Sequence, residues 1–338
     1  MRAALKKTFR TSQFALLVLL AGIALIFGAV NPQILTLANL YALIRSSLVP
    51  AVFALSIMLV MVQGGIDMSF GMIGAFSSYV VLFILTENGI FGAPLIAVFL
   101  FAIVIAVALQ LFNWVMVDKL RLQPFITTLG TQTMLKGLLL AFISTDYIYT
   151  YPASVAAFGT TYIHSAVYES GTSSQLHVSV IIVAALYVLI HLLLQHTNLG
   201  RQMYAVGGDV DAARRAGINV SRVRFLVFLL AGVICGIGGV MHDAIARASM
   251  PIPSDLVGKE LQSIAAVVLG MGASKQARGS VPGTLLGVLL LQFITGNLIM
   301  LGIPSYYQQA VSGVIIFIGL IAQMRRRSGG KSEKGELK

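Results

Sequence analysis

The chain has 338 residues, of which 57% are hydrophobic and only 10% are charged, and its mean hydropathy is +0.90. A water-soluble fold cannot cover so much apolar surface, so the composition excludes a soluble globular protein and indicates a chain embedded in a bilayer. The net charge of +11 does not indicate a nucleic-acid partner, because the basic residues recur at the ends of apolar stretches.

Apolar stretches long enough to cross the hydrocarbon core recur along the chain. A spanning helix needs roughly 20 residues. The pattern predicts spans at 13–30, 46–63, 70–86, 94–117, 124–144, 177–195, 225–243, 261–273, 281–301 and 305–324. The stretch 261–273 is short enough for a re-entrant or broken helix. The expected fold class is all-α, a polytopic membrane protein with about ten transmembrane helices.

The distribution of basic residues predicts the orientation of these spans. With a cytoplasmic N-terminus, every Lys and Arg lies on the cytoplasmic side except Arg45, Lys136, Arg247 and Lys259. This arrangement follows the positive-inside rule and places both termini in the cytoplasm. We therefore expect a transmembrane domain over residues 1–325 and a disordered cytoplasmic tail over residues 326–338.

A polar, arginine-rich stretch separates two strongly apolar spans. This stretch, residues 197–224, is called the arginine loop below. Asp209 is placed to cap a short helix, Arg214 and Arg215 lie at its end, and Gly217 is placed to stop it. A helix of two turns is marginal in water by itself, so the loop indicates a soluble partner that packs on it.

A second interruption is the GGID segment, residues 64–71, with the sequence GGIDMSFG. A carboxylate costs about 2.5–3.5 kcal/mol at mid-bilayer on insertion scales, so Asp67 needs a cap, a cavity or the interface. Because Ser69 and an apolar run follow, we favour a cap on the third span, with the carboxylate accepting bonds from free backbone N–H groups. A role in a translocation path and a role in ion coupling are the alternatives.

The fifth span begins with Pro124 and an unusually polar first half. Its polar side chains are Thr127, Thr128, Thr131, Gln132 and Thr133. They are suited equally to lining a pore and to hydrogen bonding between helices. Lys136 lies deeper in the same span, where it snorkels, pairs with an acid or faces water.

Residues 260–284 predict a short apolar helix, a basic glycine-rich turn and a new helix. The turn carries Lys275 and Arg278 and is expected to be cytoplasmic and fitted against a neighbour, with a phosphate-binding loop as the alternative. Small residues every four positions predict close helix packing within the subunit, or else a dimer contact. These residues are Gly279, Gly283 and Gly287 in one set and Gly232 and Gly236 in another.

In this order the segments resemble the ribose-type branch of bacterial ABC-transporter permeases. GGIDMSFG is similar to the family's GGIDLSVG, and PFITTLG at 124–130 to its PAFIxTLG. Residues 197–219 resemble its TxxGRxxYAxGGNxxAAxxxGIN, and residues 260–287 its ELxAIAAVVxGG…GGxGSxxGTxxG stretch. Each motif is weak alone, and the ordered set is specific and covers most of the chain.

The resemblance implies the membrane subunit of an ATP-driven importer for a sugar or sugar-like solute. Two permeases, identical or paralogous, would form the path in the bacterial inner membrane. Two cytoplasmic ATPases would dock on the arginine loops, and a periplasmic binding protein would deliver the solute. The chain itself is expected to be neither an enzyme nor the carrier of a cofactor or metal, because ATP would be hydrolysed on the separate subunit.

The resemblance also implies roles for particular residues. The candidate ATPase-coupling residues are Gly200, Arg201, Gly207, Gly208, Asp209, Ala212, Arg214, Arg215 and Gly217. The candidate residues of the translocation path or gate are Asp67, Ser69, Phe125, Thr127, Thr128 and Gln262. The chain departs from the family pattern where Asp209 replaces a usual Asn, where Gln262 replaces a common acid, and at residues 271–277. Lys136 is also atypical.

Three other functions compete with this interpretation. An ion-coupled secondary transporter would use Asp67 and Lys136, although buried ionisable residues are few. The second is an ABC permease for another solute, such as a branched-chain amino acid. It is the nearest alternative within the family, and the GGID segment favours the sugar branch over it. An intramembrane enzyme has the least support, because the sequence shows no paired carboxylates and no metal-spaced histidines.

Overall fold

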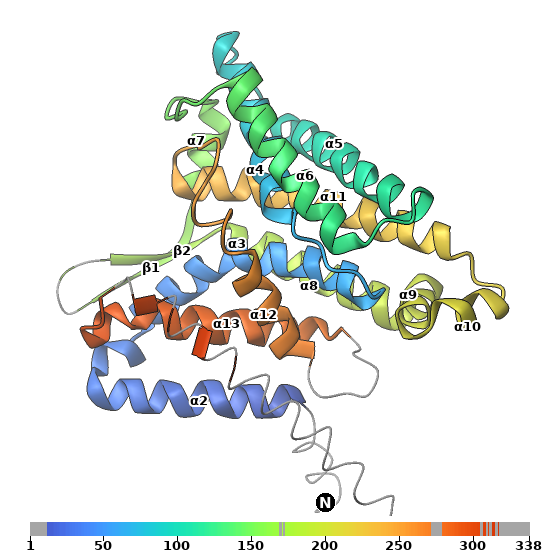
Figure 1. Cartoon of the computed structure of the whole chain (residues 1–338). Helices are drawn as coiled ribbons and strands as arrows, with labels where there is room; N and C mark the ends of the chain where they lie inside the picture. Colours follow the sequence, from blue (N-terminus) through green and yellow to red (C-terminus); the bar gives the residue numbers. More distant parts are fainter. Residues whose placement is uncertain are drawn as a thin grey trace, which may run out of the picture. The chain divides into compact units, whose positions relative to one another are not determined.

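The computed structural model describes residues 12–168, 171, 173–271 and 279–304, together with 307, 308, 310, 313, 314 and 317. These residues are mostly helical (Figure 1). The elements are α2 Ser12–Val30, η1 Pro32–Leu35, α3 Leu37–Val62, α4 Phe70–Glu87, α5 Leu95–Trp114, η2 Val115–Lys119, α6 Pro124–Leu138, η3 Leu139–Ile143, α7 Ala153–Gly159, β1 Tyr162–Val167, β2 Ser173–His177, α8 Ser179–His196, α9 Asn198–Gly208, α10 Val210–Arg215, α11 Val220–Ala246, α12 Glu260–Met271, α13 Val281–Asn297 and η4 Ile299–Leu301.

Within the described residues, 8 helices are long and apolar enough to cross a membrane. They are Gln13–Val30, Leu37–Val62, Phe70–Glu87, Leu95–Lys119, Pro124–Ile143, Ser179–His196, Val220–Ala246 and Val281–Leu301. Each coincides with one of the predicted spans, so the chain is a multi-pass membrane protein. The predicted span 261–273 is the shorter helix α12. The predicted span 305–324 and the predicted tail lie largely or wholly outside the described residues.

The chain divides into two compact units. One unit comprises residues 1–54, 164–176 and 262–338, and the other comprises residues 55–163 and 177–261. In the first unit α2 packs along α13: Leu16 is buried with Leu290 and Ile294, and Phe27 stacks on Phe293 with ring centroids 5.9 Å apart.

The second unit is built around α11, which packs on α4 and α5 (Figure 1). The predicted small residues of α11 lie at this contact. A Cβ on Gly232 would come within 2.6 Å of Cα of Val107, and a Cβ on Gly236 equally close to Cα of Ile103. The backbones of α5 and α11 therefore touch directly, and the prediction of close packing within the subunit is confirmed for this pair.

The same applies to the predicted glycines of α13 in the first unit. A Cβ on Gly283 would lie 2.1 Å from the carbonyl oxygen of Gly270, and one on Gly287 would lie 2.0 Å from that of Ala266. These glycines let α12 and α13 pack backbone against backbone. The basic turn between the two helices, with Lys275 and Arg278, lies outside the described residues.

Two local features differ from the sequence prediction. The all-α prediction missed a two-stranded sheet, β1 with β2, in the long connection before α8. Strand β1 contains Tyr162, Ile163 and Val167, which favour strands, and Gly171 between the two strands has φ +82°, which suits a turn. Helix α3 begins nine residues before the predicted span, because Asn39 and Arg45 lower the hydropathy of a first part that is nevertheless helical.

Candidate functional site

The arginine loop contains two short helices, where the sequence predicted one. Helix α9 begins after Thr197, whose hydroxyl oxygen accepts a 3.1 Å hydrogen bond from the N–H of Gly200. Helix α10 begins after Asp209, whose carboxylate accepts 2.9 Å hydrogen bonds from the N–H groups of Asp211 and Ala212. The one helix that the sequence predicted is α10, and its cap, Asp209, is confirmed.

Helix α10 turns one small residue inward and leaves its other side chains on the surface. Ala213 is buried, whereas Asp211, Ala212, Arg214 and Arg215 are exposed. Arg214 lies 3.7 Å from Asp211, but both side chains are more than half exposed, so this ion pair contributes little stability. The result is an exposed face with two arginines beside a small apolar residue.

Helix α9 is amphipathic in the same sense. Met203 and Val206 are buried, so this side of the helix faces the interior of the second unit. Arg201 is exposed, and its guanidinium donates a hydrogen bond to the side chain of Asn198 in the first turn.

Two glycines of the arginine loop are required by its geometry. A Cβ on Gly207 would lie 1.8 Å from the carbonyl oxygen of Val62, so no side chain fits between α9 and the end of α3. Gly217 ends α10 with φ +81°, a conformation that residues with a Cβ rarely adopt. A Cβ on the neighbouring Gly208 would meet nothing within 4 Å.

A cavity of about 230 Å³ lies between the arginine loop and the start of the GGID segment. The Oε1 atom of Gln63 is buried beside it and has no hydrogen-bond partner among the described residues. The lining residues are Gln63, Gly64, Gly65, Val117, Pro124, Val206, Gly207, Gly208, Asp209, Val210, Arg224 and Phe228. The loop therefore lies against the chain reversal between α3 and α4.

Asp67 lies in the non-helical stretch between α3 and α4, and its side chain is completely buried. One carboxylate oxygen accepts 2.7 Å hydrogen bonds from both the backbone N–H and the hydroxyl of Ser69, next to the first residue of α4. The other oxygen accepts a 2.6 Å hydrogen bond from Gln110 of α5. The carboxylate thus satisfies a backbone group before α4, as the sequence predicted, and also ties the stretch to α5.

The hydrogen bonds around Asp67 continue to α6. The side chain of Asn113 on α5 donates a 2.9 Å hydrogen bond to the hydroxyl of Ser69. It also accepts a 2.6 Å hydrogen bond from the hydroxyl of Thr131. Thr128 accepts a 2.9 Å hydrogen bond from the backbone N–H of Met68. The non-helical stretch before α4 is therefore joined to α5 and α6 through one buried polar network.

This surrounding changes the acidity of the carboxyl group. Burial raises the pKa of Asp67 above its ordinary value of 3.8, and the hydrogen bonds from Ser69 and Gln110 offset part of that rise. The neutral form is therefore more favoured here than in water.

The polar side chains of α6 divide into separate roles. Thr128 and Thr131 bond within the Asp67 network, and Gln132 donates to the carboxylate of Glu260, which also accepts from the backbone N–H of Gly258. These contacts are hydrogen bonds between elements, one of the two uses that the sequence left open. Thr133 donates a local hydrogen bond to the carbonyl oxygen four residues before it, and no other bond of its hydroxyl is seen within the described part of the chain.

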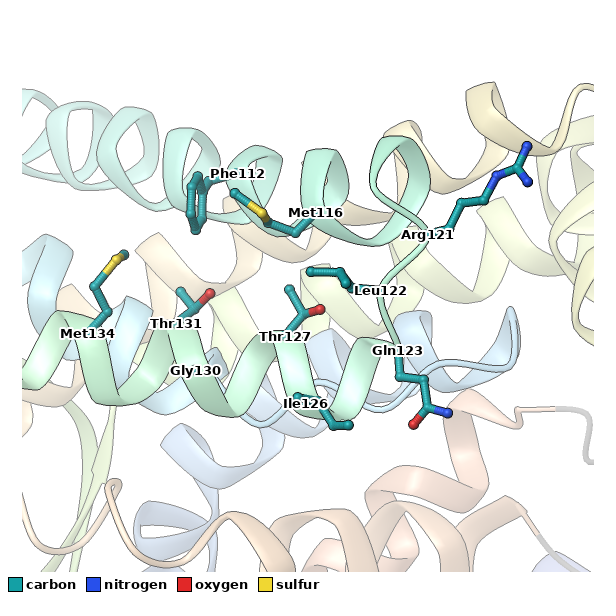
Figure 2. A pocket seen from close by; sticks show the side chains of 10 residues that line it. All are labelled: Phe112, Met116, Arg121, Leu122, Gln123, Ile126, Thr127, Gly130, Thr131 and Met134. Atoms are coloured by element: carbon teal, nitrogen blue, oxygen red, sulfur yellow. The ribbon is translucent and has the colours of Figure 1, made fainter.

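Thr127 differs from the other threonines. Its hydroxyl oxygen is buried without a hydrogen-bond partner among the described residues, although it borders a pocket of about 540 Å³ between α5 and α6. Figure 2 shows Thr127 and Thr131 pointing from α6 toward Phe112 of α5 and Met116 of η2. The other lining residues are Arg121, Leu122, Gln123, Ile126, Gly130 and Met134. This lining is mainly apolar.

The remaining candidates are not brought into this network. Phe125 is 43% exposed at the start of α6. Gln262 is half-buried on α12 and belongs to the first unit. Lys136 is half-buried, and no acidic side chain among the described residues lies within ion-pair distance of it.

The sequence analysis missed Gln110, Asn113 and Asp118, which bear directly on this site. Gln110 and Asn113 are fully buried polar residues in an otherwise apolar span, and that contrast was a signal that could have been used. Asp118 sits at the end of the same span and contacts Ser221 and Arg224 at the start of α11.

A second buried cluster also went unpredicted. His242 of α11 lies between two carboxylates, 3.1 Å from Asp243 and 2.9 Å from Asp255, and Ser249 donates 2.7 Å to Asp243. It connects the end of α11 to the segment that leads to α12. In a hydropathy profile each of these polar groups only lowers the score of a membrane span. The fold shows that they form hydrogen bonds with one another.

Comparison with known proteins shows which family this architecture belongs to. Residues 39–320 match the family described as "Branched-chain amino acid transport system / permease component". The chain is 32% identical over 317 residues to the "Ribose import permease protein RbsC" of Escherichia coli (strain K12), covering 94% of each chain.

Other relatives carry different solute names. The chain is 29% identical to the "L-arabinose ABC transporter permease protein AraH" of Azospirillum brasilense, covering 90% of this chain and 85% of the relative. It is also 29% identical to the "Autoinducer 2 import system permease protein LsrC" of Yersinia enterocolitica, covering 93% and 82%. No solved structure matches the chain. The match across most of its length, together with its set of membrane-spanning helices, shows that the chain belongs to this family of transport-system permease components.

Proposed function

We propose that the chain is the membrane-spanning subunit of an ATP-driven importer in the bacterial inner membrane, and that it translocates a sugar or sugar-like solute. A periplasmic binding protein delivers the solute, and a second permease, identical or paralogous, completes the path. The names of the relatives at 29–32% identity support a solute of this chemical class. The family description mentions branched-chain amino acids, so a permease for such a solute is the alternative within the family.

The observation that carries this proposal is the exposed face of α10. Asp211, Ala212, Arg214 and Arg215 face solvent, while α9 and Ala213 are packed against the second unit. A helix of two turns gains little stability by itself. Because α10 is held in place by packing and keeps a basic face exposed, that face is suited to binding a soluble partner. The partner is a cytoplasmic ATPase subunit, and the basic residues of the loop support a cytoplasmic location for it.

Permeation is assigned to α6. Phe125 is exposed at the start of this helix, and Thr127 borders the pocket between α5 and α6 with a hydroxyl group that has no partner among the described residues. Asp67, Ser69 and Thr128 contribute by holding the non-helical stretch beside α6 in place. Gln262 remains a candidate for the gate from its sequence position.

An ion-coupled secondary transporter is the rival outside the family. It would need Asp67 to exchange protons or ions with water during the cycle. Asp67 has no exposed surface and three hydrogen-bond donors directed at it, so its environment favours a fixed structural acid.

The experiment is uptake into proteoliposomes that contain the permease, its ATPase and its binding protein. Radiolabelled ribose, arabinose and leucine are offered with ATP inside the vesicles, and in parallel with an ion gradient and no ATP. We expect uptake of one of the two sugars that needs ATP, the ATPase and the binding protein together. Uptake by the permease alone on an ion gradient contradicts the ATP-driven mechanism, and ATP-dependent uptake of leucine alone contradicts the sugar assignment.

A further inference from the structure

Asp118 fastens the end of the arginine loop to α5. It lies in the π-helical turn η2 that ends this helix, and its side chain is only 9% exposed. The hydroxyl of Ser221 donates a 2.5 Å hydrogen bond to one carboxylate oxygen, and a guanidinium nitrogen of Arg224 lies 3.4 Å from the other. These three residues are called the Asp118 clamp below.

The clamp lies at one end of a closely packed helix pair. Next to it, Trp114 of α5 meets Phe225 of α11 edge to face, with ring centroids 5.1 Å apart. Further along, Gly232 and Gly236 bring the backbones of α5 and α11 into direct contact. A pair held both by backbone contact and by a polar clamp is suited to moving as one body.

The same helix carries the residues that hold Asp67. Gln110 and Asn113 lie on α5 two turns or less before the clamp, which corresponds to about 12 Å along a helix from Gln110 to Asp118. Gln110 donates to Asp67, and Asn113 bonds both Ser69 and Thr131 of α6. The C-terminal part of α5, with the turn η2 that follows it, is therefore attached to the arginine loop through Asp118 and to the GGID segment and α6 through Gln110 and Asn113.

We propose that Asp118 is a positioning residue for transport: by fastening the end of the arginine loop to α5, it lets α5 carry a displacement of that loop to the GGID segment and to α6. The inference rests on the proposed function, because an ATPase has to move the loop. The inference adds to that function the residues through which movement of the loop reaches the GGID segment and α6. In this route Asp118 contacts neither solute nor nucleotide.

The geometry also separates the two parts of the clamp. Asparagine at position 118 keeps an oxygen for the hydroxyl of Ser221 but loses the charge that attracts Arg224. Alanine loses both contacts. The neighbouring Lys119 is mostly exposed and lies 4.0 Å from the same carboxylate, so its removal changes the local charge while leaving the clamp in place.

The test follows the movement of α6 in the assembled transporter. Leu129 is 42% exposed on α6 and is replaced by Cys as a reporter; the chain's single natural cysteine, Cys235, is buried. The rate of maleimide labelling of Leu129→Cys is measured with and without ATP and vanadate in lipid nanodiscs. Asp118→Ala, Asp118→Asn and Ser221→Ala are compared in this background, with Lys119→Ala as the matched control. ATP hydrolysis and co-purification of the ATPase are measured on each sample.

The expected result is that Asp118→Ala still binds the ATPase and hydrolyses ATP but loses the ATP-dependent change in labelling, by roughly fivefold or more, the lower end of typical coupling between sites. Asp118→Asn and Ser221→Ala give smaller losses, and Lys119→Ala behaves as the parent. If Asp118→Ala is not recovered folded, Ser221→Ala decides the test, because it removes a single hydroxyl group.

Two outcomes overturn the inference. One is an unchanged ATP-dependent labelling change in Asp118→Ala, or in Ser221→Ala where that variant decides. The other is a parallel loss of ATPase binding and hydrolysis, which identifies a general structural role. A failure of the proposed function is seen separately, in the parent reporter protein: there the ATPase does not bind, or ATP does not alter the labelling of α6, and the inference falls with it.

Discussion

The side-chain amide of Gln110 donates a 2.6 Å hydrogen bond to the carboxylate of Asp67, across 43 residues of sequence and inside a buried part of the second unit. This contact explains how an acidic residue is accommodated between two membrane-spanning helices. The carboxylate has a partner on each side, Ser69 before α4 and Gln110 on α5. It therefore stabilises a non-helical stretch, whose backbone N–H and C=O groups lack the hydrogen bonds that a helix would supply.

Replacing Asp67 by Ala should destabilise the protein by roughly 1–3 kcal/mol, because the donors of Ser69 and Gln110 would be buried without an acceptor. Asp67→Asn should cost less, since it keeps one oxygen for Ser69. Glu87→Ala, which removes an exposed acid at the other end of α4, is the control and should stay near the parent. Thermal unfolding in detergent measures the effect, and an Asp67→Ala protein as stable as the control would contradict the network.

The raised pKa of Asp67 predicts a pH dependence with a definite sign. Burial, the largest cause, makes the folded state favour the protonated carboxyl, so the stability from this preference is lost as the pH rises above 3.8 toward the folded-state pKa. Asn at this position does not titrate. The stability of Asp67→Asn relative to the parent should therefore increase with pH over that range, and a relative stability that falls as the pH rises would exclude this environment for the carboxyl group.

Gly207→Ala should displace the arginine loop, because its Cβ would lie 1.8 Å from the carbonyl oxygen of Val62. Overpacking of this kind costs about 1–3 kcal/mol. Gly208→Ala adds the same methyl group one residue later, where nothing lies within 4 Å, and is the matched control. Limited trypsin digestion at the exposed Arg214 and Arg215 reports the displacement. Equal digestion rates in the two variants would show that the loop does not rest on α3 as described.

Asp209→Ala should loosen α10 by about 1 kcal/mol, the usual cost of losing an N-cap side chain. Asp209→Asn should be nearly neutral, because an amide oxygen can accept the same hydrogen bonds from Asp211 and Ala212. Amide hydrogen exchange across α10 measures both variants. Faster exchange in Asp209→Asn, equal to that in Asp209→Ala, would mean that charge rather than the hydrogen bonds stabilises this end of the helix.

The spans and the capped helix α10 were predictable because each depends on neighbouring residues. Hydropathy over some 20 residues locates a membrane helix, and Asp209 with Gly217 marks both ends of a short one. The partners of Asp67 were not predictable in this way, since Gln110 is distant in sequence and nothing local specifies its direction. Likewise, the sequence suggested that Thr128 and Thr127 were equivalent, and only the packing of α5 and α6 separates the bonded hydroxyl from the unpartnered one.

Docking of an ATPase on the arginine loop is tested by combining Arg214→Glu with Arg215→Glu and measuring co-purification of the ATPase and solute-stimulated ATP hydrolysis of the complex. A matched charge reversal outside the loop at two exposed positions, Arg121→Glu with Lys259→Glu, controls for the change in net charge. We predict that reversal within the loop lowers both ATPase binding and stimulated hydrolysis, while the control retains them. Intact assembly and intact stimulation in the loop variant would contradict the docking of the ATPase on this face.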